Sequence, residues 1–168
     1  MTTNEPQRAS RLTVIVGCLA AIFVVVGALV YGISTESLQR QWEHLTGRAS
    51  GPMTFRFFLQ PAMAAVAALH DGVKDARLGR SPYFWTVLTQ SGKRGERISE
   101  GLNATARIIL IGIGMDLIYQ LKVFGTFYPM EALLIALTLA FVPYLLLRGP
   151  VARIARVWLF PSSGGSTP

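Results

Sequence analysis

Residues 12–33, LTVIVGCLAAIFVVVGALVYGI, form the stretch that decides the class of this protein. The run holds 22 residues without a charge. At about 1.5 Å per residue, a helix of that length reaches about 33 Å and can cross a hydrocarbon core of about 30 Å. A cleavable signal peptide is the alternative, because Arg8 and Arg11 precede the run, but the apolar part of a signal peptide spans only about 7–15 residues. We therefore predict an uncleaved transmembrane helix over 12–34, after a short polar tail at 1–11.

Two further apolar runs lie close together near the C-terminus. The first, Ile108–Leu121, is short at about 21 Å, but Arg107 and Lys122 at its ends can extend their charges outward along apolar stems. The second run is ALLIALTLAFVPYLLL, residues 132–147. Because only the short link FGTFYP precedes the second helix, we predict an antiparallel transmembrane hairpin over 104–147.

The excess of basic residues indicates an orientation in the membrane. The formal net charge is +7 and the sequence pI is about 10.2, which in a soluble protein would suggest a nucleic-acid partner. Here the tendency of Lys and Arg to stay on the cytoplasmic side explains the charge without nucleic acid. Residues 35–107 carry ten Lys and Arg, and 124–130 carry none. We therefore expect the segment 35–103 to be a cytoplasmic loop, with the C-terminus on the same side.

The number of crossings is open between three and four. Three crossings place the N-terminal tail outside, although it carries Arg8 and Arg11. A fourth crossing would remove that conflict, and its only candidate is FRFFLQPAMAAVAALH, residues 55–70, which contains Arg56, Gln60 and a proline. We predict instead that about 55–75 form an amphipathic interfacial helix with apolar and polar faces.

Two basic segments with aromatic residues suit the cytoplasmic membrane surface. One is DGVKDARLGRSPYFWTVL, residues 71–88, and the other is RGPVARIARVWLF, residues 148–160, predicted as a second interfacial helix. Such residues can meet lipid headgroups or a partner protein. The predicted contact residues are Arg77, Arg80, Tyr83, Phe84, Trp85, Arg153 and Arg156. The polar tail at 161–168 has the composition of a disordered segment.

The pattern of reactive residues favours a protein that is not an enzyme. His44 and His70 are far apart and have no companion at metal-ligand spacing. The single cysteine, Cys18, excludes an intrachain disulfide. The sequence has no phosphate-binding Gly-Lys-Ser/Thr loop and suggests no catalytic set. We therefore expect no metal site and no cofactor.

An intramembrane carboxylate is the most informative polar residue. Asp116 lies in the run GIGMDLIYQ, and small and polar side chains share its helix face, which is typical of a face that meets other helices. The predicted contact residues are Thr105, Gly112, Asp116, Tyr119 and Gln120. Three interpretations remain open for the carboxyl. It pairs with a polar group on a neighbouring helix or subunit, it stays protonated through burial, or it belongs to a proton or ion path.

Several motifs together resemble a group of small, uncharacterised membrane proteins of proteobacteria. They are FRFFLQPAMAA, DGVKDARLGRSPYFW, RIILIGIGMDLIYQ, FYPMEALLIA and PYLLLRGPVARIARVW, which together cover about residues 54–158. The helix at 12–33 resembles an extension that shorter members lack. The resemblance implies a bacterial inner membrane and assigns no activity and no functional residues.

These observations predict an all-α integral membrane protein with three, alternatively four, transmembrane helices. We expect a non-catalytic accessory or scaffold subunit that packs against a larger membrane complex. The alternative is a small homo-oligomeric transporter or channel that uses Asp116. The expected partners are the lipid bilayer and other membrane subunits or further copies of the chain. The expected location is the bacterial inner membrane, as a multi-pass protein.

Overall fold

The structure of the chain is a computed structural model that describes residues 5–32, 35–48 and 53–159. The described residues are mostly helical and contain no strand. In chain order the helices are α1 (Glu5–Tyr31), α2 (Thr35–Arg48), α3 (Arg56–Arg77), α4 (Tyr83–Thr89), α5 (Ser91–Val123) and α6 (Pro129–Leu159). The predicted tail at 161–168 and the first four residues lie outside the described part of the chain.

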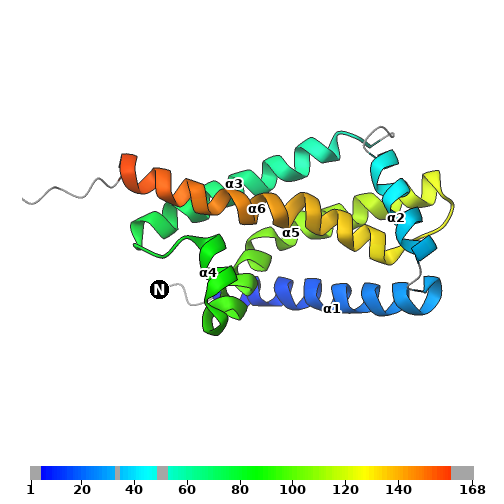
Figure 1. Cartoon of the computed structure of the whole chain (residues 1–168), viewed down its shortest axis with the longest axis horizontal. Coiled ribbons are helices and arrows are strands. Elements are labelled where there is room, and N and C mark those ends of the chain that lie inside the picture. The colour runs from blue at the N-terminus through cyan, green and yellow to red at the C-terminus, as the bar shows by residue number, and fades with distance from the viewer. Residues whose placement is uncertain (1–4, 33–34, 49–52, 160–168) are drawn as a thin grey trace, which may run out of the picture.

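Four long helices run lengthwise beside one another (Figure 1). In that view α1 and α5 run in one direction, and α3 and α6 run in the opposite direction. The closest packing joins α3 to α6 and α5 to α6. The end of the bundle that carries α4, the N-terminus of α5 and the C-termini of α3 and α6 is called the basic end below. The opposite end, covered by α2, is called the α2 end.

The helix α2 is attached across its end of the bundle by one polar and several aromatic contacts. His44 Nδ1 lies 3.1 Å from a carboxylate oxygen of Glu131, at the start of α6. The His44 ring also stacks on Phe124, with 4.3 Å between the ring centroids. These contacts fix α2 to the turn that links α5 and α6.

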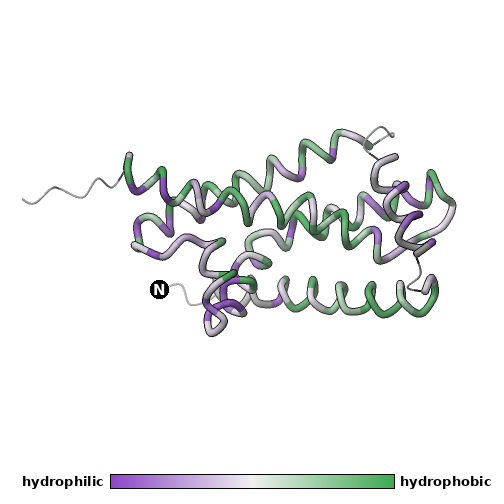
Figure 2. The backbone as a smooth tube through the Cα atoms, in the orientation of Figure 1, coloured by the Kyte–Doolittle hydropathy of each residue, from purple (hydrophilic) through white to green (hydrophobic). Residues whose placement is uncertain are grey.

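Among the described residues, three helices are long and apolar enough to cross a membrane, and the prediction of an all-α chain with such helices is confirmed. They are α1 over Arg11–Tyr31, α5 over Ser91–Val123 and α6 over Pro129–Trp158. Figure 2 shows the apolar character of α1 along most of its length. Its apolar side chains are largely exposed, with Leu29 80% exposed. A helix of this kind suits a lipid environment, because water would otherwise meet a continuous apolar surface.

The hairpin helices are longer than the sequence predicted. The helix α5 begins at Ser91, so residues 91–103 are helical rather than loop, and α6 continues to Leu159. Residues 148–159 of the predicted separate helix at 148–160 are therefore the last part of α6, and residue 160 lies outside the described part of the chain. Pro150 lies inside this helix. The helix packs closely against α3 at this position. A Cβ atom on Gly72 of α3 would lie only 2.6 Å from Val151 Cγ1.

The segment predicted as an interfacial helix packs along α6. One stripe of α3 is buried and contains Arg56, Gln60, Ala64, Ala68, Gly72, Asp75 and Ala76. The opposite face exposes the large apolar side chains of Phe58, Leu59, Met63, Val66 and Leu69. The helix has a polar and an apolar face, as the sequence predicted, but the polar stripe faces the bundle interior. The physical reason is that α5 and α6 offer buried charges that pair with those of α3.

Candidate functional site

A buried ion pair joins α3 to α5 toward the α2 end. Arg56 Nη2 lies 2.7 Å from Asp116 Oδ1, and both side chains are at most 1% exposed. The Arg56 guanidinium also lies over the ring of Tyr119, at 5.2 Å from its centroid. Gln120 Nε2 donates a hydrogen bond to the second carboxylate oxygen of Asp116. We call Arg56, Asp116, Tyr119 and Gln120 the inner cluster.

Gln120 also connects the inner cluster to the turn between α5 and α6. Its Nε2 donates to the carbonyl oxygen of Tyr128 at 3.2 Å, and its Oε1 accepts a hydrogen bond from the Tyr128 amide. One side chain therefore satisfies the backbone of the turn and orients the Asp116 carboxylate. This double role makes Gln120 part of the framework of the hairpin.

The predicted intramembrane stripe on α5 faces helices of the same chain. All five of its members, Thr105, Gly112, Asp116, Tyr119 and Gln120, are buried. Thr105 donates its hydroxyl to the carbonyl oxygen of Gly101. A Cβ atom on Gly112 would lie 2.7 Å from Gln60 Nε2 and 3.2 Å from Ala136 Cβ. The missing side chain at Gly112 thus allows α3 and α6 to approach α5 closely.

Gln60 belongs to the buried stripe of α3. Its side-chain amide has no hydrogen-bond partner among the described residues. Its side chain is 1% exposed, and neither Oε1 nor Nε2 is satisfied. It lies one turn from Arg56, against Gly112. In the sequence, Arg56 and Gln60 argue against a fourth membrane crossing at this segment. Their spacing of four, continued by Ala64 and Ala68, was the pattern that could have placed them on a buried stripe.

A second and larger charge cluster lies at the basic end. Arg148 of α6 is fully buried and donates to both carboxylate oxygens of Asp75, at 2.7 and 3.0 Å. It also donates to Glu100 of α5 at 2.7 Å and to the hydroxyl of Tyr144 at 2.6 Å. The Tyr144 hydroxyl in turn donates to Asp71. We call Asp71, Asp75, Glu100, Tyr144 and Arg148 the outer cluster; it joins α3, α5 and α6.

The outer cluster was not predicted from the sequence. Arg148 belongs to the predicted interfacial helix at 148–160, and Asp75 and Glu100 fall within the predicted cytoplasmic loop at 35–103. The position of Arg148 directly after LLL was the available indication, because an arginine that enters a packed apolar helix needs buried acceptors. The acceptors Asp75 and Glu100 lie on distant segments of the chain, so no local sequence pattern could have identified them.

Tyr83 belongs to the interior of the basic end, which corrects its prediction as a surface contact. Its side chain is fully buried and donates a hydrogen bond to the carbonyl oxygen of Arg97. The Arg148 guanidinium lies over its ring at 4.3 Å from the centroid. Burial raises the pKa of Tyr83 to about 12, against the opposing influence of Arg148. The phenol therefore stays neutral and acts as a hydrogen-bond donor and a cation-π partner.

The other predicted cytoplasmic contact residues remain at the surface of the basic end. Trp85 is 60% exposed and Phe84 is 38% exposed. Arg77 and Arg153 are exposed. Two of the predicted arginines also make contacts within the chain. Arg80 lies 3.4 Å from Glu100 and 3.7 Å from Asp75, and Arg156 donates to the carbonyl oxygen of Arg80.

Small and aliphatic side chains fill the space between the two clusters. Ala64, Ala68, Ala136 and Ala140 are fully buried there, together with Ile109. Along α5, Glu100 and Asp116 are separated by about 24 Å. In the described residues, no group of three or more His, Cys, Asp or Glu side chains could hold a metal ion. The arrangement therefore provides two internally paired ionic clusters, separated by mainly apolar packing in which Gln60 and Thr105 are the buried polar side chains.

Comparison of the chain with models of known protein families, with curated proteins and with solved structures gave no match.

Proposed function

We propose that the protein crosses a bacterial inner membrane four times, through α1, α3, α5 and α6. The support comes from α3, which lies lengthwise beside α6 and exposes a face of large apolar side chains. With 22 residues it reaches about 33 Å, the length of a membrane helix. Arg56 and Asp75 face buried partners and therefore do not have to meet lipid. The other charged residues of α3, Asp71, Lys74 and Arg77, lie in its last two turns, at the basic end, where a membrane helix reaches the headgroup region.

Four crossings also remove the conflict over the N-terminal tail. The start of α1 lies at the basic end (Figure 1), so Arg11 lies on the same side as the other basic residues there. Those residues include Lys74, Arg77, Arg80, Lys93, Arg94, Arg97, Arg153 and Arg156. The positive-inside tendency then assigns the basic end to the cytoplasm and α2 to the outside. Exposed Trp85 at the basic end and exposed Trp42 at the α2 end suit the two membrane surfaces.

We expect single cysteines on either side of α3 to face opposite sides of the membrane. In a Cys18→Ser background, Thr46→Cys should react with a membrane-impermeant maleimide in intact spheroplasts. Ser91→Cys should react only after the membrane is permeabilised. Both positions are exposed in the structure. Equal protection of both cysteines before permeabilisation would instead favour three crossings, with α3 on the cytoplasmic surface.

Within this membrane protein we propose a non-catalytic role as an accessory or scaffold subunit of a larger membrane complex. The observation that carries the proposal is the internal pairing of the buried charges. Ion pairs connect α3, α5 and α6: Arg56 pairs with Asp116, and Arg148 pairs with Asp75 and Glu100. Since Asp116 contacts Arg56 of its own chain, it is not the residue that a partner subunit would engage. The contact surface is instead the exposed basic and aromatic residues of the basic end.

A small homo-oligomeric transporter is the second candidate. Its support is the presence of ionisable groups along one bundle, since such groups mark many transport paths. The fully buried alanines between the inner and outer clusters oppose it, because they fill most of the space between the two clusters with apolar side chains. A shared axis between several copies would have to supply a polar connection.

The complex mass in a mild detergent separates the two functions. We expect extraction from the native membrane to yield a mixed complex in which this chain is one of several different proteins. The double change Arg77→Glu with Arg153→Glu should reduce recovery of those proteins several-fold, because it reverses two exposed charges at the basic end. The matched control is Lys122→Glu, an exposed charge at the α2 end. A symmetric assembly of this chain alone would contradict the accessory role and favour transport.

A further inference from the structure

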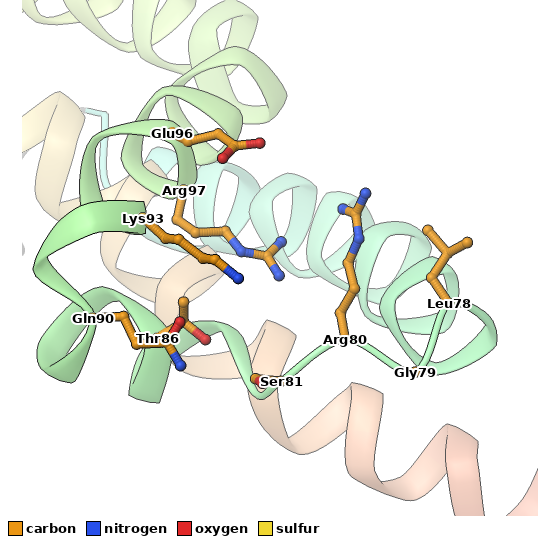
Figure 3. A pocket seen from close by; sticks show the side chains of 9 residues that line it. All are labelled: Leu78, Gly79, Arg80, Ser81, Thr86, Gln90, Lys93, Glu96 and Arg97. Carbon is orange, nitrogen blue, oxygen red and sulfur yellow. The ribbon is translucent and has the colours of Figure 1, made fainter.

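A cavity opens at the basic end, between the connection from α3 to α4, the helix α4 and the first turns of α5. Its volume is about 400 Å³. Charged and polar side chains dominate its wall, and those used below are Arg80, Ser81, Gln90, Lys93, Glu96 and Arg97. In Figure 3, Arg80 enters from one side, and Lys93 and Arg97 enter from α5 on the other. The Glu96 carboxylate lies apart from these three cationic groups in the same view.

We infer that this cavity binds a phosphate-bearing anion. Three basic side chains and one acidic side chain line the space, so an anion would meet a local excess of positive charge. Arg80 and Arg97 come from segments that only the tertiary structure brings together. A phosphate group has several acceptor oxygens, so an arginine fork and a lysine ammonium can bind it at the same time. The Ser81 hydroxyl and the Gln90 amide provide further donors on the wall.

The degree of internal pairing decides which cations a ligand can use. Arg97 is 12% exposed and lies 2.9 Å from Glu100, so its guanidinium is already paired within the chain. Arg80 is 41% exposed; it donates a long hydrogen bond of 3.4 Å to Glu100 and lies 3.7 Å from Asp75. Arg148 already occupies the same carboxylates at 2.7 Å. Lys93 has no ion-pair partner in the described part of the chain. Arg80 and Lys93 are therefore the two cations available to bind a phosphate.

The surroundings of the cavity indicate two sources for such a group. Leu78 on its wall is 56% exposed, and Trp85 and Leu88 of α4 are also exposed. In the four-crossing arrangement these apolar side chains lie at the cytoplasmic membrane surface, where the headgroup of an anionic lipid would be within reach. A soluble phosphate compound would present the same charge to Arg80 and Lys93 without using the apolar rim.

The test uses the full chain purified in a neutral detergent and two probes. Native mass spectrometry measures retention of phosphatidylglycerol, with phosphatidylcholine as the reference lipid, and calorimetric titration measures binding of inorganic phosphate. We expect saturable binding of at least one probe. Lys93→Gln and Arg80→Gln should each weaken it about tenfold, because each removes one charge-assisted contact. Lys122→Gln, which removes an exposed charge at the other end, should change the affinity less than about twofold.

The two probes distinguish the sources. Selective retention of phosphatidylglycerol without phosphate binding assigns the site to a lipid headgroup, and the converse assigns it to a soluble phosphate compound. Either result supports the anion site. The proposal is overturned if neither probe binds saturably, or if Lys93→Gln binds as tightly as the unchanged chain. Lys93 is exposed and unpaired in the described structure, so its replacement leaves the helices intact, and circular dichroism checks this.

Discussion

Replacing Arg148 with methionine should destabilise the protein more than any other single change at the basic end. The change leaves Asp75, which is 1% exposed, without the guanidinium that binds both of its oxygens, and Glu100 loses its 2.7 Å contact as well. Removal of one partner from a buried ion pair costs about 3–5 kcal/mol, because the remaining charge stays desolvated. Reversible unfolding in mixed micelles of mild and denaturing detergent measures this loss.

Two further variants show whether the loss comes from the geometry of the outer cluster. Arg148→Lys should recover only part of the stability, because one ammonium cannot reproduce the planar fork between Asp75 and Glu100. Arg153→Met removes an exposed arginine five residues further along α6 and should cost less than about 0.5 kcal/mol. If Arg148→Met and Arg153→Met unfold at the same detergent composition, the outer cluster does not hold the three helices together.

The second large effect is expected at the inner cluster, and it should disappear in a double substitution. Arg56→Met leaves the buried carboxylate of Asp116 without this guanidinium and should cost about 3–5 kcal/mol. Arg56→Met combined with Asp116→Leu removes both charges, and most of the lost stability should return. A buried ion pair replaced by apolar side chains of similar volume is often neutral or stabilising.

The double-mutant cycle on Arg56 and Asp116 also tests where α3 lies. Coupling between the two changes requires direct contact of α3 with α5, because changes at distant sites add independently. Arg107→Met, an exposed position on α5, serves as the control and should show no coupling with Arg56→Met. Simple additivity of Arg56→Met and Asp116→Leu would separate α3 from the bundle and remove the argument for a fourth crossing.

The same two clusters show the limits of prediction from the sequence. The uncharged run at 12–33 identified α1 because length and hydrophobicity along one segment are local properties. The polar stripe on α5 could also be predicted from the sequence, because a period of 3.6 residues places Thr105, Gly112 and Asp116 on one face. The position of α3 in the bundle could not be predicted from the sequence. Arg56 and Gln60 reduce its hydrophobicity, and Asp116, the buried partner of Arg56, lies 60 residues further along the chain.

The sequence by itself determined that the chain is helical with segments long and apolar enough to cross a membrane, that it has a basic excess, and that α5 has a polar face. The tertiary structure alone decided that Asp116 meets Arg56, that Arg148 gathers Asp75 and Glu100, and that Arg80 and Lys93 face one cavity. The physical reason is that the cost of burying a charge depends on what surrounds it. A helical pattern shows which face is polar. Only the packing of distant helices determines which opposite charge that face meets.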